Sequence, residues 1–164
     1  MDFINLLLNQ PIIKIGRASD LCWMTFGKSS MAKDTLGKAV ERGDYSLHLQ
    51  CPWRLCDSQN YTIKLASGDI YEPSSGVEWD EDFDWDVHGN NLFDEKVESL
   101  FPKETSTIVR DVSVSVYGDL RIIFSNMLML ECFINVSANQ ECWRFFKHGE
   151  KKHWVVYGNG KEFQ

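Results

Sequence analysis

DYSLHLQCPWRL, residues 44–55, is the stretch of sequence that decides the fold. Apolar or aromatic side chains occupy every odd position from Tyr45 to Leu55, and the even positions between them are polar apart from Pro52. A strict period of two is typical of a β-strand with one buried face and one wetter face. Proline cannot donate a hydrogen bond to a neighbouring strand, so the strand ends at Pro52, bulges there, or lies at a sheet edge.

Further strand patterns lie on both sides of this stretch. They are residues 12–15, 21–26, 112–117, 120–124, 127–135, 142–146 and 154–157. The turn signals Gly118-Asp119 and Ser125-Asn126 separate three of them, and the last two predict a closing hairpin around the polar residues 147–152.

One helix is predicted at residues 92–101. Its apolar residues recur at helical spacing, Asp94 and Glu95 lie in its first turn, and Pro102 follows its end. Either Asn90 or Asn91 caps its N-terminus.

A second helix is predicted between residues 32 and 43, where Ala32, Leu36, Ala39 and Val40 share a helical face interrupted by a glycine at position 37. Together the patterns predict an α+β fold, with a single domain over residues 1–164. We expect a mostly antiparallel sheet, either strongly curved or forming a partial barrel, with one or two helices.

The composition is that of a folded domain, with 164 residues, 43% of them hydrophobic, and a net charge of −7. No basic stripe favours nucleic acid, and the negative charge disfavours anionic membranes. Asp2 stands where a secretion signal would have a basic residue, and no stretch approaches the roughly 20 apolar residues of a membrane span. We therefore expect a cytoplasmic protein.

The negative charge is concentrated in one segment. Residues 68–104 contain 12 acidic and two basic residues, a net charge of −10, whereas the rest of the chain carries +3. At its centre is VEWDEDFDWD, residues 77–86, which we expect to form a loop or an edge strand. As a strand it would place Trp79, Phe83 and Trp85 on one side and its aspartates on the other.

Two interpretations of this segment stay open. In the first, its aromatic residues pack on the body of the protein and its carboxylates simply face water. In the second, it docks a basic protein: the aromatic residues anchor the partner, and the carboxylates speed the encounter. The expected partner-binding residues are Trp79, Asp80, Asp82, Asp84, Trp85 and Asp86.

Residues 84–95 partly match a calcium-binding loop, with Asp84, Asp86, Gly89 and Glu95 at its first, third, sixth and twelfth positions. His88 replaces the usual Asp or Asn at the fifth position, and no amphipathic helix precedes the segment. A divalent-cation-binding protein or a metal-dependent enzyme that uses this loop is therefore an alternative. Our first expectation includes neither a metal nor a cofactor.

No catalytic motif is present in the sequence. None of the four histidines lies in a nucleophile, zinc-protease or phosphate-loop pattern, and the carboxylates of residues 77–86 are too many to single out an acid–base pair. We expect no catalytic residue and no enzyme.

The five cysteines are an odd number in a chain without a secretion signal, which favours reduced, mostly buried thiols. Cys51 and Cys56 are close enough in sequence to suggest a zinc pair. An uninterrupted strand would point them to opposite faces, so structural thiols are expected.

Trp53-Arg54 and Trp143-Arg144 are two similar pairs. On strands, each Trp points inward and each Arg to the other face. Each Arg either neutralises a nearby carboxylate or contributes to an anion site for a small ligand. The carboxylates considered are Glu131, Glu141 and Asp69.

Two groups of residues are similar to those of a known family. They are SLHLQCPWRL (46–55) with GDIYEP (68–73), and ECWRFF (141–146) with HWVV (153–156). On these residues the chain resembles a family of small uncharacterised bacterial cytosolic proteins, some of which resemble immunity proteins of toxin systems. The resemblance covers the C-terminal two thirds of the chain and implies a single-domain protein without an enzymatic role. It carries over no catalytic residue.

The sequence therefore predicts a non-enzymatic cytosolic binding protein whose acidic aromatic surface binds a basic protein. By the resemblance, it predicts an immunity protein that neutralises a cognate toxin. A structural or assembly protein is a further alternative. Neither nucleic acid nor a membrane is expected as a partner, and the sequence does not define an oligomeric state.

Overall fold

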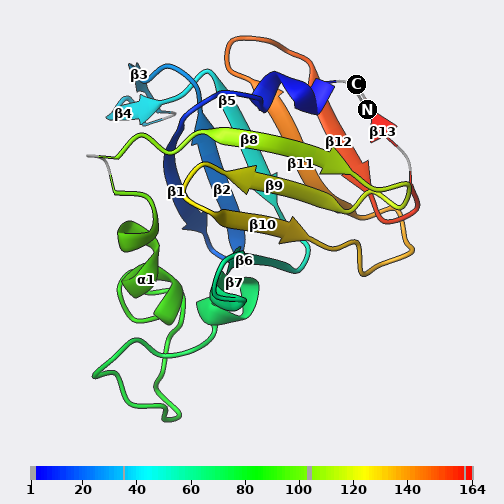
Figure 1. Cartoon of the computed structure of the whole chain (residues 1–164). Helices are drawn as coiled ribbons and strands as arrows, with labels where there is room; N and C mark the ends of the chain where they lie inside the picture. Colours follow the sequence, from blue (N-terminus) through cyan, green and yellow to red (C-terminus); the bar gives the residue numbers. More distant parts are fainter. Residues whose placement is uncertain (1–2, 35, 103–104, 161, 164) are drawn as a thin grey trace.

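The computed structural model describes residues 3–34, 36–102, 105–160, 162 and 163. Its body consists of two antiparallel sheets, with the helix α1 and a long loop at one end (Figure 1). Buried apolar side chains of both sheets form one hydrophobic core. The predicted α+β class and mostly antiparallel single domain are confirmed, and the described strands do not close into a barrel.

The larger sheet brings together strands from both halves of the chain. In spatial order its strands are β1 (Ile12–Ala18), β2 (Leu21–Phe26), β5 (Tyr45–Leu49), β11 (Glu141–Lys147), β12 (His153–Tyr157) and β13 (Glu162–Phe163). β5 pairs with β2 and β11, so that Leu47 lies between Met24 and Phe145, and all three side chains are fully buried. The predicted closing hairpin is confirmed as β11 and β12.

The smaller sheet consists of five strands. In spatial order they are β7 (Thr62–Ala66), β6 (Trp53–Asp57), β10 (Leu128–Cys132), β9 (Leu120–Phe124) and β8 (Val109–Val114). Leu55, Leu130 and Ile122 are neighbours across β6, β10 and β9, and all are fully buried. Alternation along each strand therefore supplies the inner face of this sheet.

The stretch at residues 44–55 forms a corner between the two sheets. β5 ends at Leu49, and β6 begins at Trp53 in the other sheet. Between them the N–H groups of Gln50 and Cys51 both donate to the carbonyl of Cys142, at 2.8 and 3.1 Å. The break predicted at Pro52 is confirmed, and the alternation continues through it, so Leu49 and Trp53 enter the same core.

A buried tryptophan connects the two sheets. Trp143 of β11 is fully buried, and its indole N–H donates to the carbonyl of Gly118, in the turn before β9, at 2.8 Å. A buried indole requires such a partner for its N–H. Gly118 adopts a φ of 94°, a conformation that favours glycine.

The helix α1 (Leu92–Leu100) confirms the predicted helix. Its N-cap is Asn91, whose side-chain oxygen accepts a hydrogen bond from the Asp94 N–H at 2.8 Å. Phe93 and Val97 are buried, and the ring of Phe93 meets Trp53 edge-on. Two short 3-10 helices, η1 (Phe3–Leu7) and η2 (Ser67–Ile70), also lie in the described part of the chain, where no helix is long and apolar enough to cross a membrane.

The second predicted helix is wrong. β3 (Ser30–Lys33) and β4 (Ala39–Arg42) instead pair with each other as antiparallel strands. The Asp34 carboxylate accepts hydrogen bonds from the N–H groups of Leu36 and Lys38, at 2.9 and 2.8 Å, and Gly37 adopts a φ of 79°. This turn chemistry outweighs the helical spacing of the apolar residues, and Leu36 is left exposed at the turn.

Candidate functional site

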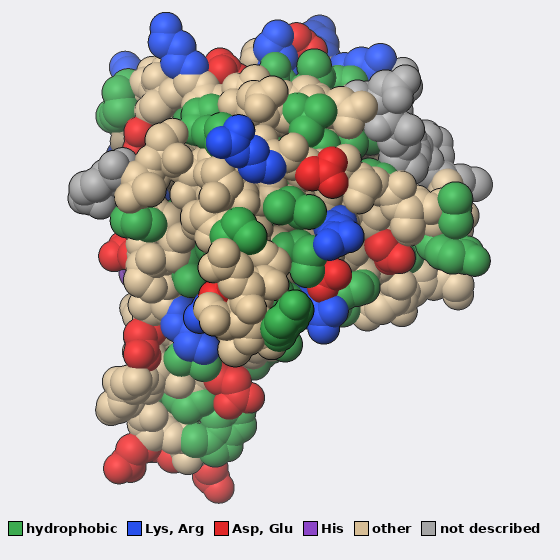
Figure 2. Space-filling model, in the orientation of Figure 1, with side chains coloured by type: hydrophobic (Ala, Val, Ile, Leu, Met, Phe, Trp, Pro, Cys, Tyr) green, Lys and Arg blue, Asp and Glu red, His purple; other side chains and the backbone are tan. Residues whose placement is uncertain are grey.

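Residues 71–91, the central part of the acidic segment, form a loop that projects from the sheets. The loop begins after η2, ends at α1, and extends past both of them (Figure 1). Figure 2 shows acidic side chains at the end of this projection, with hydrophobic side chains between them. Residues 77–87 are referred to below as the acidic loop.

Tight turns, and no strand pairing, shape the acidic loop. The Asp80 carboxylate accepts a hydrogen bond from the Asp82 N–H, and the Asp84 carboxylate accepts one from the Asp86 N–H, both at 3.0 Å. The Phe83 N–H donates to the Asp80 carbonyl at 3.2 Å. Aspartate side chains favour such local bonds. Of the two forms expected from the sequence, the segment therefore adopts the loop.

The three aromatic residues of the acidic loop do not share one face. Trp79 is 68% exposed, and its ring lies 5.3 Å from that of the half-buried Phe83. Trp85 is half-buried and meets Tyr71 edge-on, with the ring centroids 5.0 Å apart. Trp85 therefore packs on the body of the protein, while Trp79 faces water.

Arg17 on β1 holds the acidic loop against α1. Its guanidinium donates to both carboxylate oxygens of Asp94, at 2.9 and 2.8 Å, and to an oxygen of the Asp86 carboxylate at 2.9 Å. The side chains of Arg17 and Asp94 are only 6% and 3% exposed. Burial raises the pKa of Asp94, but hydrogen bonds from Arg17 and the Gly89 N–H outweigh it, and the pKa is below its ordinary value.

Further hydrogen bonds close the two ends of the projection onto each other. The Leu92 N–H donates to the Glu72 carbonyl at 2.8 Å, and the Ser74 N–H donates to the Asn90 carbonyl at 2.7 Å. The Asn91 side-chain amide donates to the Trp85 carbonyl at 2.8 Å. The base of the acidic loop is therefore fixed. Residues 78–84, called the tip below, stand free of the body.

The carboxylates of the tip are unneutralised. Of the described residues, no Lys, Arg or His forms an ion pair with the exposed carboxylates of Glu78, Asp80, Glu81, Asp82 and Asp84. Asp86 is the member of the expected partner-binding set that does form an ion pair, with Arg17. The structure thus leaves Trp79, Asp80, Asp82 and Asp84 on the open surface and uses Trp85 and Asp86 in anchoring the loop.

The carboxylates of the partial calcium-loop match are each bound to a different group of the protein. The Asp84 carboxylate accepts from the Asp86 N–H, and Asp86 pairs with Arg17. Both Glu95 oxygens accept hydrogen bonds from Ser75, at 2.5 Å from its N–H and 2.8 Å from its hydroxyl. These bonds lower the pKa of Glu95. No three His, Cys, Asp or Glu side chains of the described residues cluster in a way that would hold a metal ion.

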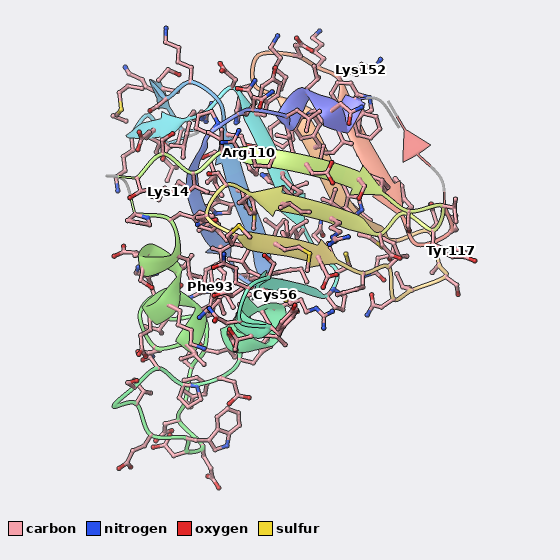
Figure 3. All side chains as sticks on the ribbon, in the orientation of Figure 1. Lys14, Cys56, Phe93, Arg110, Tyr117 and Lys152 are labelled. Atoms are coloured by element: carbon pink, nitrogen blue, oxygen red, sulfur yellow. The ribbon has the colours of Figure 1, made fainter. Side chains whose placement is uncertain are left out.

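A groove of about 610 Å³ lies beside the base of the acidic loop. Lys14 of β1 and Phe93 of α1 are among its lining residues (Figure 3), together with Trp23 and Arg17. The sequence did not reveal the groove or the role of Arg17. A single arginine in a strand pattern does not indicate which carboxylates it will pair with, and here they are those of Asp86 and Asp94, far along the chain.

Both Trp-Arg pairs have the arrangement in which the Arg neutralises a carboxylate. Arg54 lies opposite Glu131 across β6 and β10, with Nε donating to the carboxylate at 2.8 Å. Arg144 donates to Glu141 of its own strand, with Nε at 2.6 Å. These contacts account for both arginines without an anion ligand.

Three half-buried histidines surround Phe146 on the larger sheet. The rings of His48 and His148 meet Phe146 edge-on, and that of His153 stacks on it with centroids 4.4 Å apart. Ser46, which is buried, lies 2.7 Å from His148 through its hydroxyl. Burial lowers the pKa of each histidine. A buried hydroxyl is a poor candidate nucleophile, so this arrangement is read as packing.

Comparison with protein-family models, with curated proteins and with solved structures finds no match for this chain. A functional argument therefore depends on the geometry of its own residues. The most distinctive of these is the exposed Trp79 among carboxylates without ion-pair partners.

Proposed function

We propose that this chain is a non-enzymatic binding protein that recognises a basic protein partner through the acidic loop. The observation that carries the proposal is the surface around Trp79. A large apolar side chain, 68% exposed, stands among carboxylates at the tip of a loop whose base is fixed. Exposed tryptophan is an efficient anchor at protein interfaces, because covering it removes a large apolar area from water.

The fixed base of the loop favours binding. A flexible loop loses conformational entropy when a partner orders it, and this loss weakens the complex. Here Arg17 and the hydrogen bonds at the base already define where the tip lies. Little further ordering is needed when a partner covers Trp79.

The charge of the tip defines the chemistry of the partner. Its carboxylates attract Lys and Arg side chains and repel anionic surfaces. At physiological ionic strength the Debye length is about 8 Å, so this selection acts at close approach. A basic protein surface with an apolar recess for Trp79 fits both properties of the loop.

We also propose the role that the sequence resemblance implies, an immunity protein that neutralises a cognate toxin. A toxin that cleaves nucleic acid has a basic cleft for phosphates. The carboxylates of Asp80, Asp82 and Asp84 would occupy those phosphate positions and block the cleft. Trp85 and Asp86, expected from the sequence to bind the partner, are assigned to anchoring the loop.

The first test removes charge from the tip. A partner captured from the native host with the wild-type chain is identified, and its association rate with wild type and with D80N/D82N is measured over a range of salt concentrations. Asn keeps the side-chain oxygen that accepts the turn hydrogen bond from the Asp82 N–H. The double variant should associate about tenfold more slowly at low salt and show a weaker salt dependence.

The matched control is E98Q/D111N, which removes the same charge at two exposed residues without ion pairs among the described residues. It should leave the association rate close to that of wild type. Equal rates for D80N/D82N, its control and wild type would refute the proposed role of the loop.

The second test removes the anchor. W79A should raise the dissociation constant by about thirtyfold or more, because hot-spot aromatic residues contribute about 2 kcal/mol or more to binding. Its stability should change by less than about 0.5 kcal/mol, since the ring is mostly exposed. Y117A, an exposed aromatic residue far from the loop (Figure 3), is the control and should bind as wild type does. An unchanged affinity of W79A would contradict the assignment.

A further inference from the structure

Three of the five cysteines gather where the chain changes sheets. Cys51 lies in the corner between β5 and β6, Cys132 ends β10, and Cys142 is the second residue of β11. All three are free and buried. The sulfur atoms of Cys51 and Cys132 are 3.1 Å apart, in hydrogen-bond contact, although 81 residues separate them in the sequence.

Strand pairing brings these two thiols together. Cys132 lies opposite Trp53 in the β10–β6 register, and Trp53 is two residues from Cys51. The corner is itself held by the hydrogen bonds from Gln50 and Cys51 to the Cys142 carbonyl. A disulfide requires the sulfurs to be about 2.05 Å apart. The two sulfurs therefore need to approach by about 1 Å to form the bond.

The two thiols of the pair differ in acidity. The pKa of Cys51 is lowered, chiefly by the hydrogen bond from the Cys132 thiol, whereas that hydrogen bond and burial raise the pKa of Cys132. Cys51 is therefore the thiol that more readily forms a thiolate, the reactive nucleophile of cysteine chemistry. Cys132 is the protonated neighbour.

The two thiols also differ in exposure. Cys51 is 6% exposed, whereas Cys132 is fully buried. A small oxidant such as a peroxide therefore meets the pair at Cys51, because oxidation of a thiol requires access to its sulfur.

We propose that Cys51 and Cys132 form a reversible intramolecular disulfide when the protein meets a peroxide. The Cys51 sulfur attacks one peroxide oxygen, which breaks the O–O bond and gives a sulfenic acid and one water. The Cys132 sulfur then attacks the Cys51 sulfur, forms the S–S bond and releases a second water. Two thiols are oxidised by two electrons, and one peroxide is reduced to two waters. A dithiol reductant reverses the change by exchange.

The test treats the reduced full chain with hydrogen peroxide. After denaturation, the free thiols should fall from five to three per chain, and peptide mapping should find Cys51 joined to Cys132. Dithiothreitol should restore all five. Because this measurement uses the wild-type protein, it does not depend on whether a buried substitution folds.

Two variants test whether the disulfide forms between Cys51 and Cys132. C132A should keep all of its remaining thiols unpaired within the chain. C56S is the matched control, because Cys56 (Figure 3) is the one half-buried cysteine of the five and would react first with an unselective oxidant. C56S should still lose two thiols to the Cys51–Cys132 bond.

Two results would overturn the proposal. One is oxidation confined to Cys56 or ending in sulfinic acid, with no S–S bond. The other is a disulfide between Cys51 and Cys142 as the main product. A Cys51–Cys132 bond that forms in both the wild type and C56S, and that dithiothreitol reverses, supports it.

Discussion

At the scale of single residues, Arg17 determines how the acidic loop is held. Its nearly buried guanidinium meets a buried carboxylate, Asp94, and a half-exposed one, Asp86. A charge removed from water is stable only when it is paired, whereas an ion pair with an exposed partner contributes little. The two carboxylates therefore contribute unequally to stability, although both bind the same group.

The pair of variants D94N and D86N tests this inequality. D94N leaves the buried Arg17 without its main counter-charge and should lower the free energy of unfolding by about 3–5 kcal/mol. D86N, at a side chain that is 53% exposed, should lower it by less than about 1 kcal/mol. Urea denaturation of both variants measures the difference. Equal losses would contradict the assigned importance of Asp94.

At the scale of elements, the start of α1 joins the helix to the acidic loop. Asn91 is fully buried, accepts a hydrogen bond from the Asp94 N–H and donates one to the Trp85 carbonyl. One side chain therefore caps the helix and fixes the end of the loop. Asn90, which is half-buried, donates to the Asp84 carbonyl in a solvent-exposed hydrogen bond.

We predict that N91A lowers the free energy of unfolding by about 2–3 kcal/mol. It removes the N-cap and leaves the Trp85 carbonyl without this partner. N90A should cost less than about 1 kcal/mol, because water replaces the bond that it loses. Chemical denaturation compares the two, and a cost for N91A no larger than that of N90A would refute the double role.

The strands also show which features of the fold could be predicted from the sequence. The period of two at residues 44–55 predicted strands and a break at Pro52, because alternation and the missing N–H are local properties. That β5 and β6 belong to different sheets is decided by the distant strands β10 and β11. In the hairpin of β3 and β4, the signals were local but were outweighed: Asp34 and Gly37 form a turn that the helical spacing concealed.

The candidate site was predicted in part. The distribution of charged residues along the sequence was enough to locate the acidic segment, because it can be counted without a structure. The alternation of its aromatic residues was misleading, since turns built by Asp80 and Asp84 replace the strand geometry that alternation assumes. Arg17 and the Cys51–Cys132 contact join residues 69 or more positions apart, and no local pattern marks them.

At the scale of the whole molecule, the histidines around Phe146 link stability to pH. Burial lowers the pKa of His48, His148 and His153, and the nearby Arg144 and Arg42 lower it further, against a smaller opposing effect of Glu141 and Asp44. The unfolded chain therefore binds more protons on these groups than the folded chain does. Their contribution to stability is complete above the ordinary histidine pKa, about 6.5, and is lost as pH falls through the lowered folded values.

We predict that the free energy of unfolding falls between pH 7.5 and pH 5.5. Urea denaturation at several pH values measures this change, in a range where carboxylates remain ionised. The variant H148Q/H153Q should show a shallower dependence, because two of the groups no longer take up protons. A wild-type stability that is constant across this range would contradict the prediction.

The joined ends of the projection have a consequence for how the protein can diversify. Backbone hydrogen bonds at Glu72–Leu92 and Ser74–Asn90 set the separation of η2 and α1, whatever lies between them. Length and charge at the tip can therefore change without altering the spacing of the elements that carry it. The two sheets and α1 stay the same, and the surface that we propose binds the partner can vary in sequence.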